Sequence, residues 1–161
     1  MKILSIGDTC VDIIVHNKGF KLERETSAAI EMAPGGCACN FALAAAKLGM
    51  KVSLLARVGE DAFGDYILRK LGEYRVGNML RKSKLNTSAS VMIIDDEGKK
   101  AILSNKLASA DLTIKDLAIG DFDLVYIGGY YHLPKLRGKL LSFLKRTRKT
   151  GKTIAMDLVC D

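Results

Sequence analysis

Short apolar runs alternate with amphipathic segments along this chain of 161 residues. Four runs have the length and aliphatic content of buried parallel strands: Ile3–Ile6, Val52–Val58, Asp123–Ile127 and Thr153–Met156. Segments with helical spacing separate them. This alternation predicts an α/β fold in which helices cover both faces of one mostly parallel sheet.

Three segments have the spacing of helices with one apolar face. The first follows Pro34, repeats apolar residues at Phe41, Ala44, Ala45 and Leu48, and ends at Gly49. The second begins at Asp61, a candidate N-cap, and the third covers Lys135–Lys149. A shorter helix is expected over 112–117, with Asp111 as its cap.

A second group of strands is expected outside the parallel sheet. The run Val91–Ile94, the turn residues Asp95–Gly98 and the run Ala101–Leu103 indicate a β-hairpin within 88–104. Two further short strands are predicted at Val11–Val15 and Ser27–Met32. We expect the hairpin to project from the main sheet together with a strand from about 10–33.

The turn before the first helix carries the chemistry that stands out most. Pro34 fixes its own φ, and Gly35 and Gly36 leave space beside the backbone. Asn40 lies in the first turn of a helix that we expect to be buried, where an amide needs partners. Two interpretations remain open: a tight turn before a core helix, or a site for a polyol or anion at the free N–H groups.

The spacing Gly-Gly-x3-Asn-x-Ala-x5-Leu-Gly over residues 35–49 resembles the first signature of the ribokinase-like, PfkB-type carbohydrate kinases. The segment Gly7–Asp12 is similar to the family's N-terminal segment, and Val58–Gly64 resembles a part that is mainly structural there. The resemblance implies a three-layer α/β/α fold with a small projecting β-lid. It also implies that residues 1–161 are the N-terminal part of a single domain whose C-terminal half is missing.

The resemblance assigns sugar contacts to Asp12, Gly35, Gly36 and Asn40. Thr87 and Ser104 are possible further contacts. Without the resemblance, Asp12 would be interpreted as a charge that protects an edge strand. Many members carry a Gly-Ala pair after the returning strand, where this chain has Lys106-Leu107-Ala108. The resemblance further implies a homodimer formed through the lid.

The same resemblance implies ATP-dependent phosphorylation of a hydroxyl, and a sugar, a nucleoside or another polyol all stay open as the substrate. ATP and Mg²⁺ are expected for the complete enzyme, and neither is expected to bind well to this chain alone. The family's second signature, Asp-Thr-x-Gly-Ala-Gly-Asp, holds the catalytic base and phosphate site, and it is absent here. No catalytic residue is therefore assigned, Asp157 is rejected as a substitute base, and the chain alone is predicted to be inactive. The alternative is a non-catalytic sugar-binding or dimerising fragment of the same fold.

Composition and charge restrict the remaining possibilities. Cys10, Cys37, Cys39 and Cys160 lack a zinc-site spacing, so we expect reduced thiols and no metal site. The net charge is +7, and Lys135–Lys152 holds eight basic residues and no acid. Because this segment also has an apolar stripe, we interpret its charges as a solvated face rather than a nucleic-acid site. His132 is a possible substrate contact. No signal peptide or membrane segment is evident, so we expect a cytoplasmic protein.

Overall fold

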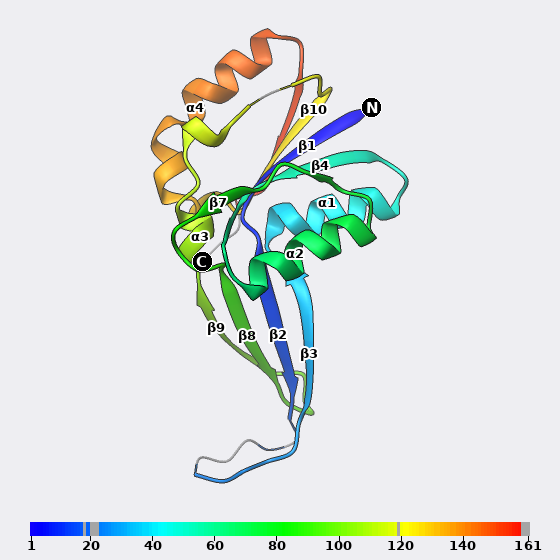
Figure 1. The fold of residues 1–161 in the computed structure, drawn as a ribbon, viewed down its shortest axis with the longest axis vertical. Coiled ribbons are helices and arrows are strands. Elements are labelled where there is room, and N and C mark those ends of the chain that lie inside the picture. The colour runs from blue at the N-terminus through cyan, green and yellow to red at the C-terminus, as the bar shows by residue number, and fades with distance from the viewer. Residues whose placement is uncertain (18, 20–22, 119, 159–161) are drawn as a thin grey trace.

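The computed structural model describes residues 1–17, 19, 23–118 and 120–158. Its main sheet has five parallel strands in the order β11-β10-β1-β4-β6. Their bounds are β1 Lys2–Gly7, β4 Lys51–Leu55, β6 Gly77–Asn78, β10 Leu124–Gly128 and β11 Thr153–Met156. The predicted parallel sheet is confirmed, with β1 at its centre (Figure 1).

Helices cover both faces of this sheet, and each face has its own apolar core (Figure 1). On one face lie α1 (Cys37–Lys47) and α2 (Ala62–Glu73), and on the other lies α4 (Pro134–Lys149). Strand β1 shows the alternation directly, because Ile3 packs in the core beside α1 while Leu4 belongs to the core beneath α4. No helix among the described residues is both long and apolar enough to cross a membrane.

A second, four-stranded sheet extends away from the α/β body (Figure 1). We call it the projecting sheet, and its order is β3-β2-β8-β9. Its strands are β2 Cys10–His16, β3 Ala29–Gly35, β8 Ala89–Ile94 and β9 Lys100–Asn105. The β2 and β8 strands pair in parallel, whereas the two outer pairs are antiparallel. Only Asp8 and Thr9 separate β1 in the main sheet from β2 in the projecting sheet.

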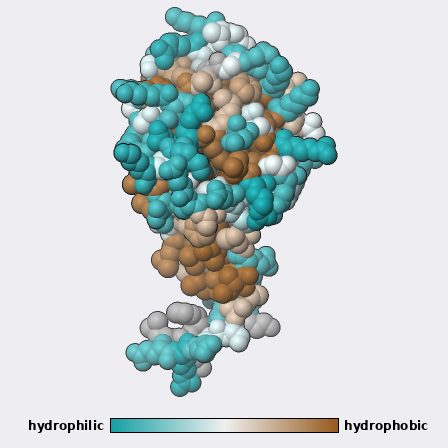
Figure 2. Space-filling view, in the orientation of Figure 1, coloured by the Kyte–Doolittle hydropathy of each residue, from teal (hydrophilic) through white to brown (hydrophobic). Residues whose placement is uncertain are grey.

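One face of the projecting sheet packs on α2 near the body. Val11 and Ile13 contribute to the core there, and the hydroxyl of Tyr66 donates to the carbonyl oxygen of Met32 at 2.7 Å. Toward the two edges of the sheet the same face is exposed. Met32, Ile13, Val91 and Leu103 form one cross-strand row, and Leu103 at its end is 67% exposed. Figure 2 shows apolar residues gathered on this sheet.

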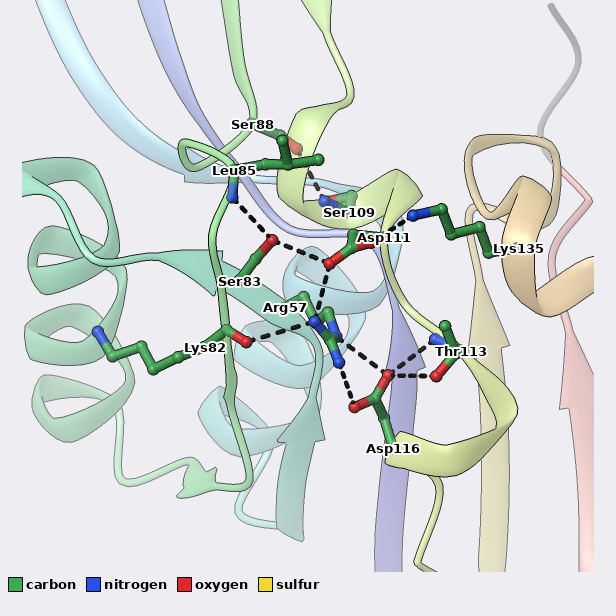
Figure 3. Close-up of polar contacts among 10 residues, drawn as sticks. All are labelled: Arg57, Lys82, Ser83, Leu85, Ser88, Ser109, Asp111, Thr113, Asp116 and Lys135. Atoms are coloured by element: carbon green, nitrogen blue, oxygen red, sulfur yellow. Dashed lines mark hydrogen bonds and ion pairs between the residues drawn. The ribbon is translucent and has the colours of Figure 1, made fainter.

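The run Val52–Val58, expected as one strand, is divided in two. The β4 strand ends at Leu55, and β5 (Arg57–Gly59) pairs instead with β7 (Arg81–Ser83) in a separate two-stranded sheet. The Arg57 side chain explains the change of direction, because its guanidinium reaches the carboxylates of Asp111 and Asp116 (Figure 3).

The helix expected over 112–117 is also corrected. Residues Leu107–Ala110 form the short helix α3, and Ile114–Asp116 form only a 3₁₀ turn, η1. Asp111 ends α3 rather than starting the next helix, and its carboxylate binds Arg57, Ser83 and Lys135. The turn is instead closed by Thr113, whose N–H and hydroxyl both donate to Asp116.

The buried face of α1 differs from the predicted one. Ala38, Cys39, Ala42, Leu43 and Ala45 are buried, whereas Ala44 and Leu48 are exposed. The small residues therefore determine the packing face, because they let the helix approach the sheet closely. The other two long helices agree with prediction, and Asp61 caps α2 by accepting from the Gly64 N–H at 2.8 Å.

Candidate functional site

The candidate site lies where the projecting sheet meets the start of α1. Strand β3 continues through Pro34 and Gly35, so the turn is shorter than expected and consists of Gly36 alone. Gly36 has φ 92°, and a Cβ atom there would lie 2.7 Å from the Cα of Thr9 and 2.8 Å from the carbonyl oxygen of Asp8. Only glycine fits this conformation and this approach.

Asp12 lies against the same turn. Cys10 of β2 pairs with Gly35 of β3, and a Cβ atom on Gly35 would collide with the Asp12 carboxylate. The thiol of Cys10 donates to Oδ1 of Asp12 at 3.3 Å. The structure therefore brings Asp12, Gly35 and Gly36 together, as the sequence predicted, with the half-buried carboxylate beside a backbone that has no side chain.

Asn40 lies one helical turn beyond Gly36, whose carbonyl oxygen accepts from the Asn40 backbone N–H at 2.8 Å. The prediction that its amide is buried is wrong, because Asn40 is on the exposed side of α1. The reason is the packing of the helix on its small residues, which leaves this position facing outward. An exposed amide close to Gly36 is free to bind a ligand from either its donors or its acceptor.

Thr87 has a framework role in this structure. Its side chain is buried, its hydroxyl donates to Oδ1 of Asp61 at 2.6 Å, and it accepts from the N–H of Gly59 at 2.9 Å. These bonds tie the start of β8 to β5 and to the cap of α2. Burial alone would raise the pKa of Asp61, but the bonds from Thr87 and Gly64 outweigh it and lower that pKa. Contact between Thr87 and a substrate stays a prediction.

Ser104 lies on the exposed outer strand β9. Its cross-strand neighbour Ser90 was not predicted from the sequence as a site residue. Asp12 pairs with Ser90 of β8, and Ser90 pairs with Ser104, so the three residues form one row across the projecting sheet. The pairing of Ser90 with Ser104 was predictable from the hairpin, because Ile94 and Lys100 flank its turn and fix the register of the two strands. Nothing in the sequence predicted that β2 pairs in parallel with β8.

Asp8 is a second residue that the sequence analysis passed over. It is buried at the end of β1, where Oδ1 accepts from the N–H of Ala38 at 3.2 Å and Oδ2 lies 3.0 Å from Nδ1 of His132. The pair joins the start of α1 to the turn η2 (Tyr130–His132) after β10. His132 is therefore close to the site, but its ring is bound to a carboxylate of the chain.

Burial is the main influence on the thiols around this turn, and nearby carboxylates add to it. Burial raises the pKa of Cys10, and Asp12 raises it further. Burial and then Asp8 raise the pKa of Cys37 to about 11, and burial raises that of Cys39 to about 11. Lys106 opposes the shifts of Cys10 and Cys37 and is the nearby cation. Cys10 and Cys39 are buried and Cys37 is half-buried, while Cys160 lies outside the described residues.

This arrangement can accept and donate hydrogen bonds to a polyhydroxylated ligand. Asp12 offers acceptors, Asn40 offers both donors and an acceptor, and the two glycines let a ligand approach the backbone. Within the described part of the chain, no group of three or more His, Cys, Asp or Glu side chains is arranged to hold a metal ion.

The chain matches a known family over its full length and individual relatives over most of it. A family model described as pfkB family carbohydrate kinase matches residues 1–161. A probable chloroplastic fructokinase from Arabidopsis thaliana is 26% identical, covering 96% of this chain and 42% of the relative. A deoxyribokinase from Salmonella typhi is 32% identical, covering 73% and 40%. The chain thus spans less than half the length of these curated relatives.

The solved structures establish the fold. A ribokinase from Giardia lamblia matches with a TM-score of 0.87 at 20% identity, covering 98% of this chain and 55% of that one. A fructokinase from Xylella fastidiosa matches with a TM-score of 0.83 at 18% identity, covering 99% and 53%. The expected three-layer fold is confirmed, and this chain corresponds to about half of each structure.

Proposed function

Because this chain belongs to the pfkB family of carbohydrate kinases, we propose that it supplies the sugar-binding half of an ATP-dependent kinase acting on a sugar or related polyol. The observation that carries the proposal is the convergence of Asp12, Gly35 and Gly36, with Asn40 one turn along α1. These residues belong to β2, to β3 and to the start of α1, three elements that meet at the Gly36 turn.

Each residue has a role that follows from its chemistry. The Asp12 carboxylate accepts hydrogen bonds from sugar hydroxyls and fixes their direction. Gly35 and Gly36 let the sugar approach the backbone, and the Asn40 amide binds a further hydroxyl. Holding the acceptor hydroxyl in one orientation is the positioning contribution to phosphoryl transfer.

We propose that ATP and Mg²⁺ bind mainly through parts of the complete enzyme outside this chain. The described residues of this chain include no group of three or more His, Cys, Asp or Glu side chains suited to a metal. The sequence also has no Walker-type loop and no second family signature. We therefore assign ATP and Mg²⁺ to the complete enzyme, propose a cytoplasmic location for it, and derive no step through either group in this chain.

Sugar binding by this chain is tested by titration calorimetry with D-fructose, D-ribose and 2-deoxy-D-ribose. Asp12→Asn and Asn40→Ala each remove hydrogen bonds worth about 1 kcal/mol, so each variant should bind about fivefold more weakly. Asp96→Asn, at an exposed position in the β8–β9 turn, is the matched control. Unchanged affinity in both site variants would contradict the assignment.

A second assay separates binding from turnover. The purified chain is incubated with Mg-ATP and the same sugars, and release of ADP is followed. We expect no sugar-dependent turnover, because general-base assistance typically contributes about 10²–10⁴-fold and no base is assigned here. Turnover near the usual kinase range of about 1–100 s⁻¹ would show that the mechanism is wrong.

We also propose that two copies of this chain associate through the projecting sheet. Support comes from the row of Met32, Ile13, Val91 and Leu103, in which Met32 is 45% and Leu103 67% exposed, and whose partners would be the same residues of a second copy. This surface is also what a non-catalytic dimerising fragment would use. The two functions differ in their sugar dependence, which the calorimetric titration measures.

A further inference from the structure

A pocket of about 510 Å³ lies at the outer end of the projecting sheet, the end that is farthest from the α/β body (Figure 1). The strands β2 and β8 end there side by side, because their parallel pairing runs as far as His16 and Ile94. Asn17 extends it, with its N–H donating to the carbonyl oxygen of Ile94 at 3.0 Å. Asn17 follows Asp12 by five positions, so the pocket lies about 17 Å along β2 from the candidate site.

Asn17 lines this pocket with an amide whose oxygen is unpaired. The residue is only 7% exposed, and its Oδ1 is the only buried side-chain nitrogen or oxygen in the described part of the chain that has no hydrogen-bond partner. A buried acceptor without a donor costs free energy in the folded chain. Because the last torsion of an asparagine side chain is broad, the amide is able to turn its oxygen toward a donor that enters the pocket.

Asp95 supplies a second acceptor to the same pocket. Its Oδ1 accepts from the N–H of Glu97 at 3.0 Å and from that of Lys99 at 2.8 Å, which fixes the carboxylate in the β8–β9 turn. Among the described residues, Oδ2 takes no hydrogen bond and the carboxylate has no ion pair. The ammonium of Lys99 pairs instead with Glu97. Asp95 therefore presents an unpaired oxygen and an uncompensated charge.

The rest of the lining is small, with an apolar part and a polar part. Ala28, Ala29 and Ile94 form the apolar part, and His16 and Ser27 add a ring nitrogen and a hydroxyl. No lysine or arginine of the described chain lines the pocket. The pocket is therefore negative on the Asp95 side and apolar along another wall, within the size range of ligand sites.

These features fit a primary ammonium group on a short aliphatic chain. An ammonium has three donors and no acceptor, so it matches the oxygens of Asn17, Asp95 and Ser27. Its bond to the carboxylate is charge-assisted, and its aliphatic carbons suit the apolar wall, as lysine stems suit apolar surface. A divalent metal fits less well, because no group of three or more His, Cys, Asp or Glu among the described residues is arranged for one.

We propose that this pocket is a second ligand site, in which Asn17 and Asp95 bind the primary ammonium group of an aliphatic amine. A free amine and a lysine side chain of another protein carry the same group, and the experiment below separates these two sources. The site is independent of the proposed sugar site, because Asp12 lies toward the other end of β2.

The test is a titration of the ¹⁵N-labelled wild-type chain with n-butylammonium chloride at constant ionic strength, followed by ¹H–¹⁵N correlation spectra. Tetramethylammonium is the matched control ligand, since it has the same charge and no N–H donor. We expect saturable shifts of the Asn17 side-chain amide and the Lys99 backbone N–H with butylammonium only. Putrescine and Nα-acetyl-lysinamide are then compared: tighter binding of the first indicates a free amine, and of the second a protein side chain.

Two variants test the assigned residues. Asp95→Asn keeps the oxygen that holds the turn and replaces Oδ2, so butylammonium should bind about tenfold more weakly. Asn17→Leu removes the unpaired oxygen and should weaken binding about fivefold. Asp65→Asn, at an exposed position on α2, should bind like the wild type. If Asn17→Leu does not fold, its spectrum shows this and Asp95→Asn decides.

Four results would overturn the proposal. The wild-type chain shows no saturable shift with butylammonium, or tetramethylammonium shifts the same signals equally, which indicates a general attraction of cations. Calcium chloride alone saturates the same signals at lower concentration, which makes the pocket a metal site. Finally, the folded variants bind butylammonium as tightly as the wild type, which excludes the assigned oxygens.

Discussion

Nδ1 of His132 lies 3.0 Å from Oδ2 of Asp8, joining two residues 124 positions apart. Asp8 is also the residue whose other carboxylate oxygen holds the first turn of α1, through the N–H of Ala38. One buried carboxylate thus connects the end of β1, the start of α1 and the turn after β10. The candidate site is built on this junction.

Replacing His132 should destabilise the fold. In His132→Ala the Asp8 carboxylate loses a partner while it stays buried, and we expect a loss of about 1–3 kcal/mol in the free energy of unfolding. Urea unfolding followed by circular dichroism measures it. The other histidine provides the control, because His16 is exposed and His16→Ala should change stability by less than about 0.5 kcal/mol. Equal effects in the two variants would contradict the role given to the Asp8–His132 contact.

Arg57 should contribute more than any surface cation. Its guanidinium donates to Asp116 at 2.8 and 3.0 Å and to Asp111 at 2.8 Å, and these side chains are largely shielded from solvent (Figure 3). Arg57→Met leaves two carboxylates without this partner and should cost about 2–3 kcal/mol, below the loss for a fully buried pair. Arg69→Met removes an exposed pair with Glu73 and should cost less than about 1 kcal/mol. Similar losses in both would show that the Arg57 cluster adds no special stability.

The same cluster should make stability depend on pH at the acid end. Hydrogen bonding by Lys135 lowers the pKa of Asp111 below its ordinary 3.8, and bonds from Arg57 and Thr113 outweigh burial to lower that of Asp116. A carboxylate with a lowered folded-state pKa stabilises the fold above the unfolded value, and this is lost as pH falls through the folded value. The unfolding free energy should therefore decline below about pH 4. The decline should be shallower in Arg57→Met. If the variant and the wild-type chain decline in parallel, the Arg57 ion pairs are not the cause of the pH dependence.

The outer end of the projecting sheet offers a test of association. Leu103→Glu places a charge in the uncovered apolar row and should convert a dimer to monomer, as measured by sedimentation velocity. Leu48→Glu changes a leucine that is even more exposed, at 76%, on the body of the molecule and should leave the dimer intact. A wild-type chain that sediments only as a monomer across the micromolar range would refute the interface.

Local pattern was enough to predict most elements of this fold. Apolar runs located four of the five strands of the main sheet, and Asp61 marked the start of α2. The fifth strand, β6, is only Gly77–Asn78 and has no apolar run to mark it. The division of the run Val52–Val58 into two strands could not be predicted, because a distant side chain decides the local structure there. The chain turns away from the main sheet at Arg57 because the Arg57 guanidinium binds the carboxylates of Asp111 and Asp116. Those two residues lie more than 50 positions later in the sequence. No window around residue 57 contains that information.

The residues of the candidate site likewise fall into those that the local sequence can assign and those that it cannot. Gly35, Gly36 and Asn40 share one turn and one motif, so sequence spacing could assign them. Ser90 and Asp8 have no such neighbourhood, because their relevance depends on strand pairing and on a contact with His132. Asn40 lies in the first turn of α1 as predicted, but its predicted burial is wrong, because the helix buries its alanines and turns the amide outward. Its role in ligand binding stays a prediction.

The central place of β1 has a consequence for how the domain is made. Ile3 pairs with Val52 on one side and with Leu124 on the other, so β1 is synthesised before both of its neighbours. A nascent chain that has reached the projecting sheet still presents one unpaired edge of β1, the strand that ends up in the middle. The main sheet therefore closes late in translation, and a ribosome that stalls between β9 and β10 holds an intermediate able to pair with another chain.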